Sequence, residues 1–386
     1  MMDITAFAAS APGRLVPTIR EQKAFVPNPL PPDLDIAPIQ QTLSDADQKI
    51  GELRGIGRYI PNPYLLIRPL QRREAIASSN IEGTYTSLPE LLMLESGVED
   101  QPRTADTQEV LNYTRALRQG IERLDQLPIS TRLICELHKE LLANLPRRRA
   151  GYLQAGDYRQ DQNFIGRIRD IAKSRFNPPP PPIHRECMSD LEKFINSSNN
   201  YNIPALVLVS LIHYQFETIH PFPDGNGRVG RILIPLILKS KSIMEQPLLY
   251  MSQFFEDNRD EYVDLLLAVS QRGAWVEWIE FFLKGVTRSC DKTIETIYKV
   301  RELQDSYKER CQQARNSVLL LQIVDSLFES IVTTVPIVRQ MTGTSYTAAL
   351  NNVKKLVKYD ILKPAYVSTH RPKYYFATEL INLFES

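Results

Sequence analysis

Most of the chain has apolar positions three or four residues apart, which is the spacing of helices that bury one face. Two segments, residues 204–219 and 232–238, are apolar almost throughout, so we expect buried helices there and not half-exposed strands. Between them lies the polar sequence HPFPDGNGRVGR, residues 220–231. We therefore predict a mainly α fold in which a polar loop is fixed at both ends by buried helices.

Helical spacing and end signals place further helices on both sides of this loop. Gly83 follows a helical segment as a C-terminal glycine would, and Ser87 with Glu90 forms the Ser-x-x-Glu capping box of the next helix. Proline-rich residues 1–40 lack periodicity, which predicts an extended or partly disordered arm. Residues 284–313 are charged and helical without a wide apolar face, which is typical of a connector. Other helices are expected over 39–56, 64–82, 105–145, 185–195, 258–269 and 275–283.

The chain from residue 315 onwards has a different pattern. Helices are expected over 318–328, 335–341 and 345–359, followed by short strands at 361–363 and 372–376 around a turn at His370 and Arg371. This order resembles a winged helix-turn-helix domain, with Lys354, Lys355 and Lys358 on the recognition helix. Domains of that type bind DNA, but they also serve as dimer or protein contacts, and the sequence leaves these alternatives open.

Between residues 151 and 171 the helical pattern gives way to a Gly-rich, alternating one. Residues 156–166 are typical of a short β-hairpin with an exposed edge. Such an edge can bind an extended segment of another protein by strand pairing. An ordinary surface hairpin is the structural alternative.

Composition narrows the class of protein. The chain has 386 residues, 43% hydrophobic and 24% charged, which is typical of a globular protein with two or three domains. Its formal net charge of +1 gives no overall attraction to nucleic acid or to anionic membranes. Its four cysteines form no CxxC pair, and we find no signal peptide and no apolar run long enough to span a membrane. We therefore expect a cytoplasmic protein with reduced thiols.

The polar loop combines residue types that suit a phosphate substrate. Gly225 and Gly227 let backbone N–H groups approach an anion, and a helix that begins near Asn226 would direct its free N–H groups at the same anion. Asp224 can hold Mg²⁺ through one carboxylate when the substrate supplies phosphate oxygens. His220, which precedes a proline, is expected to be extended and free to act as a general base.

The whole run resembles the signature of the Fic family, His-Pro-Phe-x-Asp-Gly-Asn-Gly-Arg-x-x-Arg, and matches it at every fixed position. Most enzymes of that family transfer AMP from ATP to a Tyr, Ser or Thr hydroxyl of a target protein. The resemblance implies that His220 deprotonates the target hydroxyl, that Asp224 binds Mg²⁺, and that Arg228 and Arg231 neutralise the phosphates. A Gly-rich turn with a capping histidine and surface arginines is the structural alternative.

The resemblance also implies a wider binding set and a flap. Residues 156–166 correspond to the family's flap, which aligns the target segment beside the catalytic loop. Tyr262 stands where the family often has an aromatic residue near the nucleotide, although it could equally belong to the core. We assign no function to His138. The cofactor-binding set implied by the resemblance is Asn163, Phe164, Ile165, Gly166, Asp224, Gly225, Asn226, Gly227, Arg228, Val229, Gly230, Arg231 and Tyr262.

A second short pattern lies upstream. Many Fic proteins carry an inhibitory helix with the pattern Ser/Thr-x-x-x-Glu-Gly/Asn, which Ser78, Glu82 and Gly83 match. The resemblance implies that Glu82 pairs with Arg231 and so blocks the position that the ATP γ-phosphate needs. A carboxylate–arginine pair competes directly with an arginine–phosphate pair.

Together these observations predict a protein adenylyltransferase with ATP and Mg²⁺ that is autoinhibited by Glu82. It could also modify itself or remove AMP from its target. The alternatives are transfer of another phosphate-containing group, such as UMP or phosphocholine, and a nucleotide-sensing regulator bound to DNA. Homodimer formation stays open. The expected division is an N-terminal region with the inhibitory helix (1–125), a Fic core with a β-hairpin flap (126–285), a helical linker (286–314) and a winged helix-turn-helix (315–386).

Overall fold

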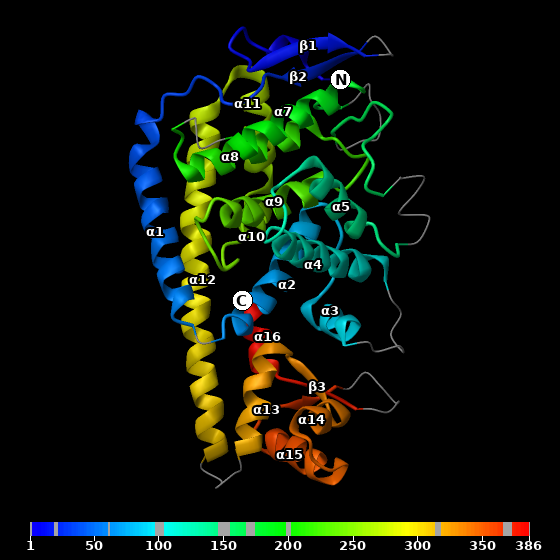
Figure 1. The fold of residues 1–386 in the computed structure, drawn as a ribbon, viewed down its shortest axis with the longest axis vertical. Coiled ribbons are helices and arrows are strands. Elements are labelled where there is room, and N and C mark those ends of the chain that lie inside the picture. Colours follow the sequence, from blue (N-terminus) through cyan, green and yellow to red (C-terminus); the bar gives the residue numbers. More distant parts are fainter. Residues whose placement is uncertain are drawn as a thin grey trace.

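Two buried helices, α8 (Ala205–Ile219) and α9 (Asn226–Ser240), form the centre of the larger part of the molecule (Figure 1). The structure is a computed structural model that describes residues 2–18, 22–60, 62–96, 104–145, 155–166, 174–197, 202–312, 318–365 and 373–385. Both helices are buried on nearly all sides, as their apolar sequences predict. The mainly helical fold is thereby confirmed.

Further helices surround this pair. The end signals are confirmed: Ser87 and Glu90 form the predicted capping box, and Gly83 follows α2 with a φ of +82°. The surrounding helices are α1 (Gln40–Arg58), α2 (Tyr64–Ile81), α3 (Leu88–Glu95), α4 (Ala105–Arg123), α5 (Thr131–Leu141), α7 (Ile183–Ser197), α10 (Ser252–Asp257) and α11 (Arg259–Arg272).

The N-terminal arm is a β-hairpin. Strands β1 (Gly13–Pro17) and β2 (Lys23–Pro27) pair antiparallel, with Leu15 opposite Phe25. Phe25 is fully buried, and its ring centroid lies 5.9 Å from that of Phe176. The arm is therefore held by aromatic packing. The sequence did not predict this packing, because it involves a residue distant in the chain.

One long helix, α12 (Trp275–Gln312), runs from the helical core to the C-terminal part (Figure 1). It packs along α1, and its buried residues include Ile294, Ile297, Val300 and Tyr307. Residues 284–313, expected to have no wide apolar face, therefore have a narrow one that packs against neighbouring helices. The buried positions form a narrow stripe between charged residues, so the average composition hides them.

The C-terminal part contains the three predicted helices and a small sheet, together with a strand at 332–334 and a last helix that the sequence did not predict. The sheet has the strand order β3-β5-β4, with both pairs antiparallel. Helix α16 contacts α2, and Arg310 of α12 forms an ion pair with Glu379 of α16 at 2.8 Å. The turn predicted at His370 and Arg371 lies outside the described residues. The elements are α13 (Val318–Glu329), β3 (Val332–Thr334), α14 (Val335–Thr342), α15 (Tyr346–Lys358), β4 (Lys363–Pro364), β5 (Tyr374–Phe376) and α16 (Thr378–Glu385).

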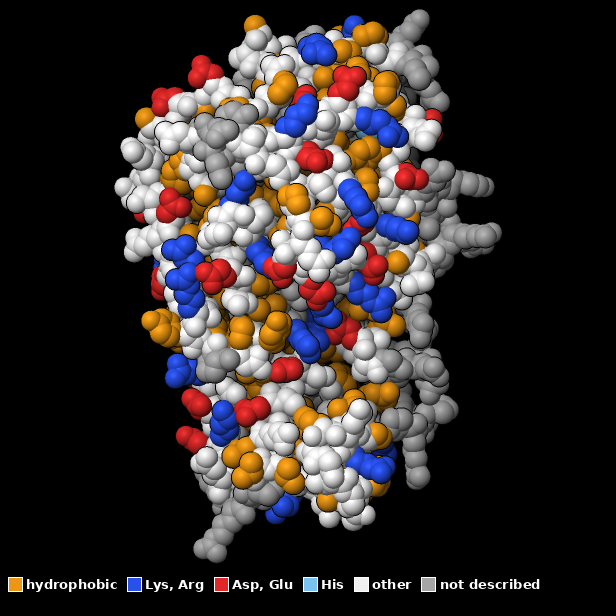
Figure 2. Space-filling view, in the orientation of Figure 1, with side chains coloured by type: hydrophobic (Ala, Val, Ile, Leu, Met, Phe, Trp, Pro, Cys, Tyr) orange, Lys and Arg blue, Asp and Glu red, His pale blue; other side chains and the backbone are white. Residues whose placement is uncertain are grey.

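The surface carries charges of both signs. Figure 2 shows Lys and Arg side chains interspersed with Asp and Glu over one face of the molecule, in keeping with the net charge of +1. Among the described residues, none of the helices combines the length and the apolar character that spanning a lipid bilayer requires.

Candidate functional site

The polar loop joins α8 to α9 through a reversal of the chain at His220. This residue has a left-handed backbone, with φ 50° and ψ 59°, and its N–H donates to the Phe216 carbonyl at 3.0 Å. The expectation of an extended His220 was therefore wrong, because the residue ends a helix by turning the chain back. Gly225, with a φ of +78°, then leads into α9.

Asn226 fixes the shape of the loop from within. Its Oδ1 accepts a hydrogen bond from the Phe222 N–H, and its Nδ2 donates to the Phe222 carbonyl, both at 2.8 Å. The Asn226 side chain is thus used inside the loop and is not free to contact a ligand. Among the residues that the structure describes, no side chain caps the N-terminus of α9. The first backbone N–H groups of this helix can therefore bind an anion.

His138 of α5, to which we assigned no function, holds the loop from a second side. Its Nδ1 accepts from the Gly156 N–H at 3.0 Å, so its Nε2 carries the proton and donates to the Asp224 carbonyl, also at 3.0 Å. Its ring stacks on Phe222, with centroids 3.9 Å apart. Burial lowers the pKa of His138 to about 4, so the ring is neutral near pH 7. The apolar face of residues 133–141, which includes His138, was the sequence signal for its burial.

Arg159 is a third support that sequence patterns did not indicate. Its N–H donates to the Pro221 carbonyl and its Nε to the His220 carbonyl, both at 2.9 Å. Its guanidinium also donates to the Asp161 and Pro179 carbonyls. Arg159 is therefore a buried cation that holds the backbone of His220 through carbonyl groups.

The predicted flap is only partly described. Asn163 Nδ2 donates to the Phe222 carbonyl at 3.2 Å, which ties this segment to the loop. Ile165 forms an isolated antiparallel bridge with Phe176, and Phe164 and Gly166 flank it. Residues 155–166 contain no longer strand, and 167–171 lie outside the described residues.

The two signature arginines are both engaged by acids in this structure. Arg228 Nη1 lies 2.8 Å from Glu109 Oε2 of α4, and both side chains are buried. Arg228 Nη2 lies 3.7 Å from Asp224 Oδ1. Arg231, of which only 2% is exposed, donates from Nε to Ser78 Oγ at 2.7 Å and from Nη2 to the Ser78 carbonyl at 2.8 Å.

Glu82 completes the contacts of Arg231. Its Oε1 accepts from Arg231 Nη2 at 2.7 Å, so the ion pair that the sequence suggested is present. Glu82 stands directly after α2, where the Gly83 N–H donates to the Asn80 carbonyl and the Thr84 N–H to the Ser79 carbonyl. This pair of bonds is a Schellman motif, which needs the left-handed Gly83. Burial opposes ionisation of Glu82, but the charge and hydrogen bond of Arg231 leave its pKa below the usual value.

The His220 ring is arranged to accept a proton. A carbonyl can only accept, so the 3.2 Å contact between Nδ1 and the Glu217 carbonyl assigns the proton to Nδ1. Nε2 then has its lone pair available. Burial, helped by the charge of Arg159, lowers the pKa of His220 to about 4, which keeps the ring neutral near pH 7.

Three members of the predicted binding set lie in the core. Val229 is fully buried, and the Cα of Gly230 faces the Glu217 carboxylate so closely that a Cβ would lie 2.1 Å from Glu217 Oε1. Tyr262 is 3% exposed, hydrogen-bonded to His213 Nε2 at 2.8 Å and stacked on Phe255. In this structure Tyr262 therefore belongs to the aromatic core.

Asp224 is the exposed acid of the loop. Its side chain is 61% exposed, and its Oδ1 accepts from the Gly225 N–H at 2.6 Å. Within the described ranges, no three His, Cys, Asp or Glu side chains gather closely enough to hold a metal ion. A cation here would take most of its ligands from a substrate and from water.

Comparison with known proteins places these features in a family. Residues 40–122 match the model described as Fic/DOC family N-terminal, and residues 128–238 match the Fic/DOC family model. The chain is 30% identical over 163 residues to the protein adenylyltransferase fic-1 of Caenorhabditis elegans, covering 41% of this chain and 30% of that protein. It is 31% identical over 222 residues to the protein adenylyltransferase Fic of Nematostella vectensis, covering 52% and 45%. The aligned part thus spans less than half of either relative.

Solved structures show the same fold at lower identity. A Fic family protein from Desulfovibrio desulfuricans G20 has a TM-score of 0.56 at 19% identity, covering 90% of this chain and 98% of that one. Fic-1 of C. elegans has a TM-score of 0.52 at 22% identity, covering 68% and 74%. The two family matches and the shared fold together show that this chain carries the N-terminal and Fic domains of the Fic/DOC family.

Proposed function

We propose that the protein is an adenylyltransferase that moves AMP from ATP to a Tyr, Ser or Thr hydroxyl of a target protein. The observation that carries the proposal is the position of His220. A neutral imidazole with an available Nε2 stands in the same short loop as the uncapped N-terminus of α9. A base beside an anion-binding helix end is what transfer of a phosphorus group to a hydroxyl requires.

The proposed roles follow from this arrangement. The N-terminus of α9, from Gly225 to Gly227, would hold the phosphates of ATP. The hydroxyl oxygen attacks the α-phosphorus, the bond to the bridging oxygen breaks, pyrophosphate leaves, and the proton passes to His220 Nε2. Asp224, as a single exposed carboxylate, fits Mg²⁺, which would neutralise charge on the phosphates. The rate gain would come mainly from positioning and charge stabilisation.

The contacts of Arg231 favour an autoinhibited state. Its side chain donates hydrogen bonds to Ser78 and Glu82 at the end of α2, so Arg231 is engaged before any nucleotide binds. We infer that Glu82 must leave Arg231 before the γ-phosphate takes its transfer position. The segment 156–166, tethered by Asn163, would border the target segment. A released Glu82 could also direct water at an AMP-modified target, which would make the enzyme bifunctional.

Labelling with ATP that carries the label at the α-phosphate tests these roles. Glu82→Gly should raise labelling of the protein itself and of lysate proteins, whereas the matched change Glu122→Gly on α4 should leave labelling at the wild-type level. Adding His220→Ala to Glu82→Gly should return the signal to background. An undiminished signal in that double variant would remove His220 as the base, and an unchanged signal in Glu82→Gly would remove the inhibition.

The transferred group is tested in the same assay. Unlabelled ATP should compete with the label, and excess UTP or CDP-choline should not. Preferential competition by either of these would favour transfer of UMP or phosphocholine. Mass spectrometry of proteins modified by Glu82→Gly in a lysate would identify the target and the modified hydroxyl.

DNA binding is a second proposed activity, carried by the C-terminal part. Lys354, Lys355 and Lys358 are all exposed on α15, which follows α14 after a short turn at Gly343. This order supports a winged helix-turn-helix with α15 in the major groove. A gel shift of the full chain should weaken with rising salt and disappear when the three lysines are replaced by alanine. A shift that persists in that variant would exclude this surface.

A further inference from the structure

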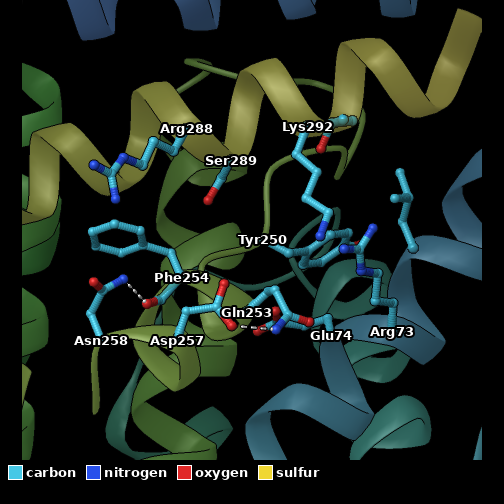
Figure 3. A pocket seen from close by; sticks show the side chains of 12 residues that line it. Arg73, Glu74, Tyr250, Gln253, Phe254, Asp257, Asn258, Arg288, Ser289 and Lys292 are labelled. Carbon is cyan, nitrogen blue, oxygen red and sulfur yellow. Dashed lines mark hydrogen bonds between the residues drawn. The ribbon is translucent and has the colours of Figure 1, made fainter. Parts of the chain in front are cut away.

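A cavity lies between α2, α10 and α12, and none of the residues that line it belongs to the signature loop, residues 220–231. It has a volume of about 210 Å³ and is lined by residues of these helices and of the segments that flank α10. In Figure 3, Arg288, Ser289 and Lys292 come from α12, Arg73 and Glu74 come from α2, and Gln253, Phe254 and Asp257 form the opposite side.

Three cations line this cavity. Lys292 extends towards Tyr250 and Arg73, and Arg288 lies over the Phe254 ring, 5.8 Å from its centroid (Figure 3). Within the part of the chain that the structure describes, Arg73, Arg288 and Lys292 form no ion pair with any acid. Burial lowers the pKa of both Arg73 and Lys292, and the charge of Arg73 lowers that of Lys292 further. Arg73 and Lys292 therefore repel each other, and the charge of Asp257 compensates them only in part.

The two acids that line the cavity are already used by protein groups. Glu74 accepts from the Tyr113 hydroxyl at 3.0 Å and from both the N–H and the hydroxyl of Ser252, at 3.1 and 2.5 Å. Asp257 Oδ1 accepts from Gln253 Nε2 at 2.9 Å, and its charge acts on Arg73 and Lys292 only over a longer distance. Both Glu74 oxygens and Asp257 Oδ1 thus accept hydrogen bonds from other donors.

The rest of the lining suits a small organic anion. Leu70, Tyr250 and Phe254 supply apolar and aromatic surface, while Ser289 and Asn258 supply polar groups. A mostly apolar cavity with a few convergent polar and charged groups is the usual form of a small-molecule site. Arginine and lysine together bind phosphate oxygens through charge-assisted hydrogen bonds.

We propose that the cavity between α2, α10 and α12 binds a small phosphate-bearing anion through Arg73, Arg288 and Lys292. The bound anion would bridge α12 to α2. Helix α2 carries Ser78 at the inhibitory contact one turn after Glu74, and Tyr113 contacts Glu74 from α4. The ligand would therefore contact α2, the helix whose Ser78 is hydrogen-bonded to Arg231. Its binding does not depend on the proposed transfer activity.

Isothermal titration calorimetry of the full chain tests the proposal with two probes, inorganic phosphate and AMP. The double variant Arg288→Met/Lys292→Met keeps the apolar stems and should weaken binding of at least one probe about tenfold or more, because two charge-assisted contacts are lost. The matched variant Lys284→Met/Lys299→Met removes two cations of the same helix that are paired with Glu280 and Glu295. It should bind as the wild type does.

The outcomes are separable from those of the labelling assay, because calorimetry requires no transfer. Tighter binding of AMP than of phosphate, lost in the double variant, would show that the aromatic wall holds a nucleoside. If AMP and inorganic phosphate bind equally well and the double variant loses both, the cavity recognises only the phosphate group. Binding that is the same in wild type and the double variant, or absent for both probes in the wild type, would overturn the proposal. Thermal melting of each variant checks that it is folded.

Discussion

At the scale of single residues, His138 shows how much of the loop depends on a side chain outside it. Replacement of His138 by Phe keeps the stacking on Phe222 but leaves the Gly156 N–H and the Asp224 carbonyl without their partners. Two hydrogen bonds of this kind are worth about 1–3 kcal/mol. We expect the free energy of unfolding in urea to fall by about that amount.

The control for His138→Phe is Arg132→Phe on the same helix. Arg132 is largely exposed, and its ion pair with Glu136 spans one helical turn. Exposed pairs of that type contribute little, so this change should stay within about 0.5 kcal/mol of wild type. Equal losses in both variants would mean that His138 has no special role in holding the loop.

Glu217 supplies a prediction about pH. It is the acid against Gly230, and its Oε1 is buried without a hydrogen-bond partner among the described residues. Burial raises the pKa of Glu217 from 4.5 to about 7. The charge of Arg231 opposes this rise, and the charge of Glu82 adds a smaller contribution to it. At Glu217 the folded protein therefore binds more protons than the unfolded chain between about pH 4.5 and 7. The contribution of Glu217 to the free energy of unfolding therefore falls as the pH rises through this range.

Replacement of Glu217 by Gln should remove that loss. The variant should gain stability relative to wild type as the pH is raised from 5 to 8 in urea unfolding experiments. Glu122→Gln, an exposed change on α4, should track the wild type at every pH. A constant difference between Glu217→Gln and wild type across this range would show that Glu217 titrates normally in the folded protein.

The sequence indicated some residues of the site and missed others for a physical reason. Gly83 was predicted from a local helix-end signal, whereas the Glu82–Arg231 pair was implied only by the resemblance to the Fic family, whose short patterns contain both residues. Arg159 and His138 were missed, because their partners, His220 and Asp224, lie far away in sequence. Only the fold brings those groups together, and no spacing rule encodes such contacts.

At the scale of elements, the approach of α8 to α9 depends on a glycine. A Cβ on Gly230 would lie 2.1 Å from Glu217 Oε1 and 3.1 Å from Phe216 Cδ1 of α8. Gly230→Ala should therefore force the Glu217 carboxylate and the Phe216 ring out of their packed positions and cost about 1–3 kcal/mol of stability. The measurement is again the free energy of unfolding in urea.

Gly51 of α1 is the matched control with the opposite expected sign. A Cβ there meets no atom within 4 Å, so alanine adds helix propensity without a clash. Gly51→Ala should stabilise the protein by about 0.5–1 kcal/mol. If both alanine variants are stabilised, then the close approach of α8 and α9 at Gly230 is not a constraint in solution.

Whole elements were predicted where a strong period or an end signal was present. Helices α8 and α9 were identified from apolar runs, and α3 from its capping box. The hairpin of β1 and β2 was not, because prolines interrupt its alternation and its stability comes from Phe25 packing on Phe176. Propensity at the level of one segment says nothing about such a distant partner.

At the scale of the whole molecule, one hydrophobic core extends from Val26 near the N-terminus to Phe384 near the C-terminus. Helix α12 contributes to it along its length, between α1 on one side and α16 on the other. A predicted linker at 286–314 therefore coincides with a helix that is packed into the molecule. A perturbation of the core should in consequence affect the part around α8 and α9 and the C-terminal part together.

The buried histidines of this core predict how the stability of the protein changes as the pH falls. Burial lowers the pKa of His138, His184 and His220 to about 4 and that of His213 to about 3, from 6.5. The unfolded chain then binds more protons than the folded protein between about pH 4 and 6.5, so stability must fall as the pH drops through that window. Each histidine contributes up to about 1.4 kcal/mol per pH unit. Glu217 acts in the opposite direction, and so do Asp47, Glu74 and Glu256, whose pKa values burial also raises. We expect the four histidines to outweigh these carboxyl groups between pH 5 and 6.5.

Urea unfolding of the Glu217→Gln variant, which lacks one of the opposing groups, is the measurement. Its free energy of unfolding should decrease steadily from pH 6.5 to 5, and the signals of Trp278 in α12 and Tyr374 in the C-terminal sheet should change in one transition. A free energy that stays level or rises over this range would mean that the buried histidines accept protons without unfolding. In that case the neutral imidazole on which the proposed role of His220 depends would have to be abandoned as well, because the same burial accounts for both.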